Sequence, residues 1–161
     1  MKVRVLALVL TLTVPPAAAA QEAVFLVRHA ERADSSADSA LSDAGEARAI
    51  RLAEWMRTTR ITHIYTSELR RTIQTAMPFA SASHLAPRQS AASDTQGLVG
   101  RIVGLGPADR ALVVGHSNTI PEILRALGVK VPVTIGDSEY DNIFLVVPRG
   151  NAEPALFRFK Y

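Results

Sequence analysis

Short apolar runs alternate with helical patterns along the chain. The runs at 23–27, 61–66 and 111–115 predict buried strands. Between them, apolar residues recur at spacings of three and four, which is typical of a helix with one buried face. Three such stripes are clear: Ala49, Leu52, Ala53 and Met56; then Leu69, Thr72, Ile73, Ala76 and Met77; then Ile120, Ile123, Leu124 and Leu127.

Capping and breaking residues mark where these helices begin and end. Ser42 can cap the first helix, and Pro78 is expected to kink or end the second. A weaker helix over 95–105 has Asp94 as its cap. In the last helix Pro121 fits the first turn, and Gly128 marks the end.

Two closing strands, 142–147 and 155–159, read as an antiparallel pair. Alternating strands and helices predict an α/β fold, a three-layer α/β/α sandwich whose mostly parallel sheet has an antiparallel edge strand. In such folds the active site lies at the carboxyl ends of the strands. Two linkers separate the elements, 33–40 and 81–93, and the first is either a mobile flap beside the site or an ordinary surface loop.

The first 20 residues have the layout of a secretory signal peptide. Lys2 and Arg4 form a basic start, residues 5–14 are apolar, and three alanines ending at Ala20 resemble a cleavage site. We expect cleavage near Ala20, with an uncleaved N-terminal anchor as the alternative. The folded domain is then 21–161, and its location is secreted or periplasmic.

Composition narrows the classes of partner. The formal charge of +3 falls to about +1 without Lys2 and Arg4, and no basic block carries interleaved aromatic residues. We therefore expect no nucleic-acid partner and no stable membrane insertion after cleavage. The absence of cysteine excludes disulfides, a thiolate nucleophile and a zinc site built on sulfur.

The run Arg28-His29-Ala30-Glu31-Arg32 stands where the first apolar strand ends. A histidine between arginines suits a site for an anion, and phosphate is the anion that the forked guanidinium donors fit best. Neighbouring cations favour the neutral imidazole, which can attack phosphorus.

Two further segments follow strands in the same way. Ser67 to Ala76, which contains Arg71, follows the second strand, and Gly115-His116-Ser117-Asn118 ends a later one. His116 can donate a hydrogen bond to a transferring group. Ser117 and Asn118 can bind phosphate at a helix start, cap that helix, or do both.

Taken together and in order, these segments resemble the signature of the histidine phosphatase superfamily, also called phosphoglycerate mutase-like, and in particular its short single-domain phosphatases. The matching stretches are Leu26 to Glu31, Ser67-x-Leu69-x-Arg71-Thr72-x-x-Thr75-Ala76, and Gly115 to Asn118. Ala30 replaces the usual glycine, as in several short members of the family.

The resemblance implies roles for individual residues. His29 would be the nucleophile that forms a phosphohistidine, Arg28 and Arg71 would bind the phosphoryl group, and His116 would complete the pocket. Arg32 matches a second arginine that acid phosphatases of the superfamily carry. Neither a metal nor another cofactor is expected.

The general acid is not evident from the resemblance. Mutase-type members carry a glutamate in an insertion after the second segment, but residues 77–110 contain none. Asp94 lies at a suitable distance to protonate a leaving oxygen, or it only caps its helix. Glu31, Glu122 and the run Asp137 to Asp141 are further candidates. A phosphohistidine substrate would need less help from an acid.

The leading hypothesis is a phosphatase that hydrolyses phosphomonoesters or phosphohistidine through an intermediate on His29, acting on a phosphorylated small molecule or a phosphoprotein. The alternatives are a phosphomutase, a non-catalytic binder of phosphorylated ligands, and a metal hydrolase that uses His29, Glu31 and His116. Arginines around the histidines disfavour the last, because they would repel a cation.

Overall fold

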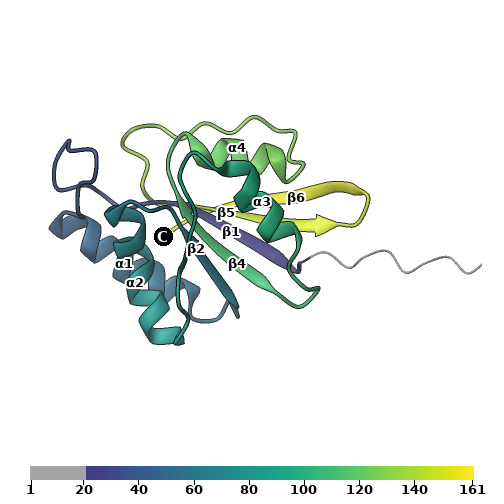
Figure 1. Cartoon of the computed structure of the whole chain (residues 1–161), viewed down its shortest axis with the longest axis horizontal. Coiled ribbons are helices and arrows are strands. Elements are labelled where there is room, and N and C mark those ends of the chain that lie inside the picture. Colours follow the sequence, from purple (N-terminus) through teal and green to yellow (C-terminus); the bar gives the residue numbers. More distant parts are fainter. Residues whose placement is uncertain (1–20) are drawn as a thin grey trace, which may run out of the picture.

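A computed structural model describes residues 21–161, so the predicted signal peptide lies outside the described residues. Within this range no helix is both long and apolar enough to cross a membrane. The elements follow one another as strands and helices in alternation, closed by a hairpin (Figure 1). In chain order they are β1 (Ala23–Arg28), α1 (Asp43–Met56), β2 (His63–Thr66), α2 (Arg70–Ser83), β3 (Arg88–Gln89), α3 (Thr95–Val103), β4 (Arg110–Gly115), α4 (Thr119–Ala126), β5 (Asn142–Arg149) and β6 (Ala152–Lys160).

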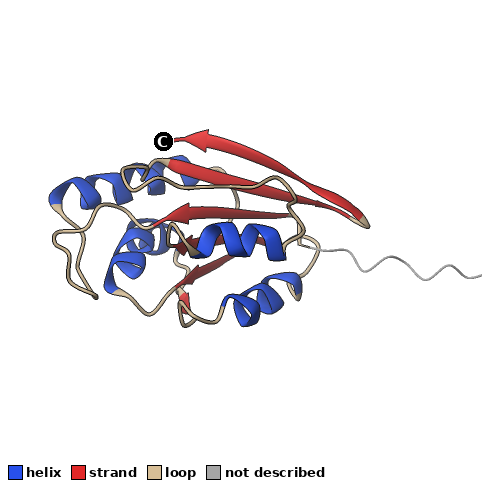
Figure 2. Ribbon diagram, turned by 90° about the horizontal axis from the view of Figure 1, so that it is seen from above, coloured by secondary structure: helices blue, strands red, loops and turns tan. Residues whose placement is uncertain are grey.

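The strands form one mixed sheet in the order β3-β2-β4-β1-β5-β6. The first four strands in this order are parallel, whereas β5 is antiparallel to both β1 and β6. The β5–β6 hairpin therefore extends the sheet at one edge, as Figure 2 shows. The predicted α/β class with an antiparallel edge is confirmed.

Helices cover both faces of the sheet, with α1 and α2 on one side and α3 and α4 on the other (Figure 1). Alternate residues of β1 face opposite layers: Leu26 packs with the α3–α4 side, and Phe25 and Val27 pack with the α1–α2 side. Both faces of a central strand are thus buried, which explains why β1 reads as a continuous apolar run.

Several predicted helix boundaries are confirmed by capping contacts. The hydroxyl of Ser42 accepts a hydrogen bond from Gly45 N and so caps α1. After α4, Gly128 has a φ of +93°, a left-handed conformation that ends the helix at little cost for glycine. Pro121 lies in the first turn of α4, where its missing N–H costs no helical bond.

Two details differ from the sequence prediction. Helix α2 does not end at Pro78 but continues to Ser83, because Phe79 and Ala80 beyond the proline are buried in the core. Their packing opposes the cost of about 3 kcal/mol that an interior proline carries. Strand β3 was not predicted, since its two residues, Arg88 and Gln89, are exposed and polar and give no apolar pattern.

Candidate active site

The parallel register brings the three sequence segments to one edge of the sheet. Arg28 at the end of β1 is level with Gly115 at the end of β4, and Thr66 at the end of β2 is level with Val114. The residues that follow these strand ends therefore lie side by side. The rings of His29 and His116 meet edge to face, with centroids 5.3 Å apart.

A cavity of about 500 Å³ opens over these strand ends. It is lined by six of the seven residues assigned to the site from the sequence, namely Arg28, His29, Arg32, Arg71, His116 and Asn118. Three of the six are arginines, so the lining of the cavity is positively charged and suits an anion. Asp94, the seventh residue, is not among those that line it.

His29 is held in one orientation by the backbone. Its backbone N–H donates to Gly115 O at 2.9 Å, and its ring atom Nδ1 lies 2.7 Å from Ala30 O. A carbonyl oxygen can only accept, so Nδ1 carries the proton of the neutral ring. The lone pair is then on Nε2, the nitrogen available for attack.

The environment keeps both histidines neutral. The pKa of His29 is lowered from 6.5 to about 3, chiefly by burial, although its hydrogen bond to Ala30 opposes the shift. Smaller contributions come from His116, Arg71 and Arg28. The pKa of His116 is lowered to about 4, again chiefly by burial and then by the same two arginines. Neutral imidazoles are the form that nucleophilic attack requires.

These shifts predict that the fold loses stability in weak acid. Unfolded imidazoles take up protons below about pH 6.5, whereas the folded rings stay neutral down to about pH 4, so the unfolded state binds more protons. We expect the free energy of unfolding to be highest above pH 6.5 and to fall as the pH drops through this window. Urea denaturation across this range measures the decline.

A double variant, His29→Asn with His116→Asn, serves as the control for this decline. It should show a clearly shallower loss of stability over the same pH range, because the two titrating groups are gone. An unchanged slope would mean that other groups, such as paired carboxylates, cause the loss.

Arg28 is fixed by a loop from the other end of the chain, residues 136–141. Its Nη1 donates to Gly136 O and Asp137 O, both at 2.9 Å, and to Glu139 O at 3.3 Å. Its guanidinium also lies over the ring of Tyr140, 4.0 Å from the centroid. These contacts orient Arg28 beside His29, so the loop belongs to the site.

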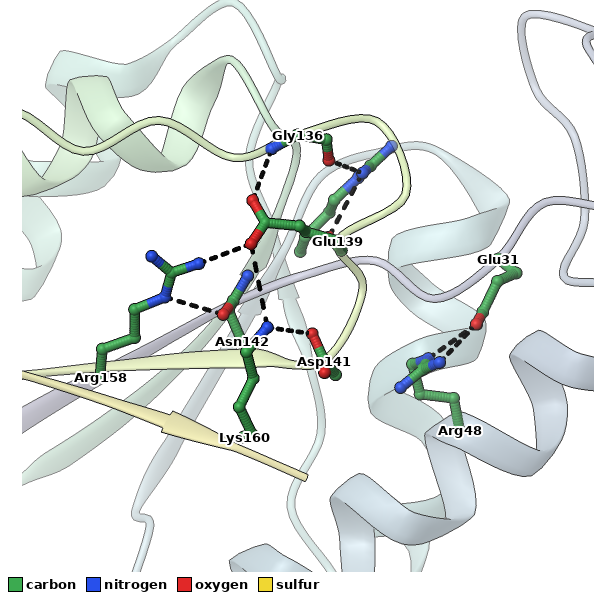
Figure 3. A network of polar contacts seen from close by, with 9 residues as sticks. Glu31, Arg48, Gly136, Glu139, Asp141, Asn142, Arg158 and Lys160 are labelled. Carbon is green, nitrogen blue, oxygen red and sulfur yellow. Dashed lines mark hydrogen bonds and ion pairs between the residues drawn. The ribbon is translucent and has the colours of Figure 1, made fainter.

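Glu139 in turn ties this loop to the edge hairpin, as Figure 3 shows. One carboxylate oxygen accepts from Gly136 N at 2.7 Å, and the other pairs with Arg158 of β6 at 2.7 Å. Lys160, also of β6, pairs with Asp141 at 2.6 Å. The two antiparallel strands thus hold the loop that orients Arg28.

Arg71 is fixed by the loop 33–40, the flap candidate of the sequence prediction. Its Nη1 donates to Ala37 O at 2.8 Å, and the Asp38 carboxylate accepts from Arg70 N at 2.8 Å. Asp38 thereby satisfies a free N–H at the start of α2, where Leu69, the N-cap residue, provides no side-chain cap. The pKa of Arg71 is lowered, chiefly by burial and then by the positive charge of Arg32. Both effects disfavour the charged guanidinium, so a bound anion would stabilise it.

His116 is oriented by a short chain of hydroxyl groups. Its Nε2 lies 3.0 Å from Ser67 Oγ, which lies 2.9 Å from Thr72 Oγ1. All three residues are buried. Ser67 and Thr72 were noticed only as parts of the second motif, and the structure shows that they position the second histidine.

The structure separates Asp94 from the other predicted site residues. Its Oδ1 accepts from Gly97 N at 2.9 Å and caps α3, so the capping interpretation is confirmed, and the carboxylate is not brought into the cavity. Glu31 is bound by Arg48 at 2.6 Å, and Glu122 accepts from Thr95 at 3.2 Å. Neither of them lines the cavity.

Two contributors to the site were not singled out as residues from the sequence. Tyr140 lies in the candidate run Asp137 to Asp141 and Asp38 in the loop 33–40, and only their contacts with Arg28 and Arg70 reveal these roles. Ala30, which replaces the usual glycine, is fully buried against Leu41 and Ala49, so its methyl group is accommodated by packing. Among residues 21–161, no three His, Asp or Glu side chains are grouped to hold a metal ion.

The fold and the site together define an α/β protein with a histidine–arginine pocket at the carboxyl ends of its parallel strands. Residues 24–93 match the family model of the histidine phosphatase superfamily (branch 1). The predicted resemblance to the histidine phosphatase superfamily is thereby confirmed. A search of curated protein sequences gives no match.

Solved structures share the fold over nearly their whole length. A mycobacterial glucosyl-3-phosphoglycerate phosphatase matches with a TM-score of 0.69 and 15% identity, covering 87% of this chain and 98% of its own. A provisionally assigned phosphohistidine phosphatase of Agrobacterium tumefaciens matches with a TM-score of 0.67 and 20% identity, covering 87% and 99%. A provisionally assigned α-ribazole-5′-phosphate phosphatase of Escherichia coli matches with a TM-score of 0.71 and 13% identity, covering 88% and 97%. At these identities the likeness establishes the fold.

Proposed function

We propose that this chain is a phosphatase that hydrolyses phosphomonoesters, or phosphohistidine, through a covalent phosphohistidine intermediate on His29. The observation that carries the proposal is the state of His29, a buried neutral imidazole whose Nδ1 proton is engaged by Ala30 O. Its Nε2 lone pair is free for phosphorus, and two arginines beside it can bind the phosphoryl oxygens.

In the proposed reaction each neighbouring residue has one task. Arg28 and Arg71 bind the equatorial oxygens, whose negative charge is spread out in the transition state. If the Ser67 hydroxyl donates a hydrogen bond to His116 Nε2, the neutral ring of His116 carries its proton on Nδ1. That N–H can then donate a hydrogen bond to a phosphoryl oxygen. Arg32 and Asn118, at the exposed rim, are proposed to contact the phosphate from outside.

The alternatives fit the site less well. A non-catalytic binder of phosphorylated ligands has no need of the nucleophile, and His29 is present and neutral. A phosphomutase would keep its product bound for a second transfer, yet between α2 and β4 the chain has only β3 and α3 and no long insertion to cover the site. The related structures named above act, by their names, on chemically different phosphates, so the leaving group stays open.

Location and metal use are part of the same proposal. The pattern of residues 1–20 supports export to the periplasm or the medium. The charge of the pocket supports a reaction without a metal ion, because Arg28, Arg71 and Arg32 would repel a cation.

Hydrolysis of 4-nitrophenyl phosphate by purified protein lacking residues 1–20 tests both activity and metal use. We expect turnover that is unchanged by excess EDTA, because the arginines replace a metal as the phosphate ligands. Addition of Mg²⁺ or Zn²⁺ after chelation is the control. Loss of activity with EDTA and recovery with metal would favour the metal-hydrolase alternative, and absence of turnover under all conditions would contradict the phosphatase.

A further inference from the structure

Hydrolysis of an alkyl phosphate requires a proton donor for the leaving oxygen. A well-placed general acid accelerates such a step by about 100- to 10,000-fold. Neither histidine of the site suits this task, because His29 is the proposed nucleophile and burial keeps His116 unprotonated at neutral pH. A carboxyl group at the cavity is therefore the remaining candidate for the proton donor.

Asp137 is the carboxylate residue that lines this cavity. All 15 aspartates and glutamates of the chain lie within residues 21–161, and of these Asp137 alone lines the cavity of His29. Other candidates are committed elsewhere: Glu31 to Arg48, Asp94 to the start of α3, and Glu122 to Thr95.

The backbone of Asp137 is held while its carboxylate remains free. Its carbonyl oxygen accepts from Arg28 Nη1 at 2.9 Å, so residue 137 is adjacent to a phosphate-binding arginine. Glu139 and Asp141, on the same loop, are paired with Arg158 and Lys160 of β6 (Figure 3). Within the described part of the chain, the carboxylate of Asp137 itself forms no hydrogen bond or ion pair, so it is available to a substrate.

We propose that Asp137 is the general acid of the phosphoryl transfer, an inference that rests on the proposed phosphatase activity at His29. In the first step the lone pair of His29 Nε2 forms a bond to phosphorus. The bond from phosphorus to the leaving oxygen breaks, and that oxygen keeps the electron pair and takes the proton of the Asp137 carboxyl group. The products are phosphohistidine, a free alcohol and the Asp137 carboxylate.

The second step returns the enzyme to its starting state. Water attacks phosphorus and gives one proton to the Asp137 carboxylate, and the nitrogen–phosphorus bond breaks with its electron pair returning to Nε2. The charged and titratable groups that line the cavity with Asp137 are Arg28, Arg32, Arg71, His29 and His116. The negative charge of a bound phosphoryl group offsets that of the arginines around Asp137.

A series of phosphomonoesters with different leaving groups tests this assignment in the Asp137→Asn variant. Asparagine keeps the size of the side chain and the backbone carbonyl that accepts the hydrogen bond from Arg28, but it cannot donate an acidic proton. We expect kcat/KM for a simple alkyl phosphate to fall at least about 100-fold, and that for 4-nitrophenyl phosphate, whose leaving group needs no proton, to change less than about threefold. Asp43→Asn, the same substitution at an exposed aspartate in the first turn of α1 outside the cavity, is the matched control and should leave both rates unchanged.

The pattern of losses distinguishes the possible results. A loss that grows with the basicity of the leaving group supports Asp137 as the acid. An equal loss for all esters would overturn it, because that pattern belongs to a residue that only positions Arg28, and so would an unchanged alkyl phosphatase rate. If the unsubstituted protein hydrolyses no ester at all, the proposed function fails, and that result is separate from any effect at Asp137.

Discussion

Replacing His29 by alanine should lower the turnover of 4-nitrophenyl phosphate by at least about 1,000-fold, since removal of a nucleophile from a group that acts as a unit eliminates most of the catalysis. The substitution removes the Nε2 lone pair but leaves Arg28 and Arg71 in place. Arg28 is held by carbonyls of the loop 136–141 and Arg71 by Ala37 O, and none of these contacts involves the imidazole. Binding of inorganic phosphate should therefore persist within about tenfold, equivalent to about 1.4 kcal/mol.

The test combines kinetics, phosphate titration and trapping of the intermediate. Rapid quenching of the unsubstituted protein should capture an acid-labile phosphoenzyme, and the His29→Ala variant should yield none. His63→Ala is the matched control, because His63 starts β2 at the opposite end of the strand and pairs with Thr62 and Asp109. If the His29 variant stays folded and keeps more than a few per cent of the rate, another residue is the nucleophile.

Replacing Gly45 by alanine should destabilise the fold by about 3 kcal/mol, because the new methyl group has no room. A Cβ at this position would lie 2.3 Å from Glu31 O, and the nearby Glu31 N and Glu31 C leave it no direction in which to move. The obstacle is backbone, which cannot rotate away as a side chain can. Glu31 O also accepts from Ser42 N at 3.0 Å, so α1 begins in direct contact with the segment that follows His29.

Chemical denaturation measures the free energy of unfolding of Gly45→Ala, with Gly100→Ala as the control for the same substitution at an open position. Gly100 lies inside α3, and a Cβ there would meet nothing within 4 Å. We expect Gly100→Ala to stabilise the protein by roughly 0.5–1 kcal/mol through better helix propensity. If the two variants have equal stability, the close approach of α1 to Glu31 is not a constraint on the fold. The residual activity of Gly45→Ala should also fall, since residues 29–31 must shift to admit the methyl group.

Local patterns were sufficient to predict most of the elements. The buried strands β1 and β4 have apolar residues at every position that faces a helix layer, and the helices repeat apolar residues every three or four positions. Both signals are contained in a few consecutive residues, so no tertiary knowledge is needed to detect them. Strand β3 was missed for the opposite reason, because its two exposed residues are defined only by pairing with Tyr65 and Thr66.

The candidate site divides in the same way. His29, Arg71 and His116 were predicted because each follows a strand within a recognisable motif, and parallel strands bring such positions to one edge. Asp94 was placed among the site residues by its distance along the sequence. Its carboxylate caps α3 instead, because the free N–H groups of a helix start lie within reach of the residue just before them.

By itself, the sequence determined the fold class, the order of the elements and the residues that gather at the strand ends, since these follow from local periodicity and motif order. Only the tertiary structure decided what holds those residues. Arg28 depends on carbonyls more than 100 positions away, and the start of α2 depends on Asp38, which is 32 positions away. Such contacts are made through space by backbone atoms and single side chains, so they leave no periodic trace in the sequence.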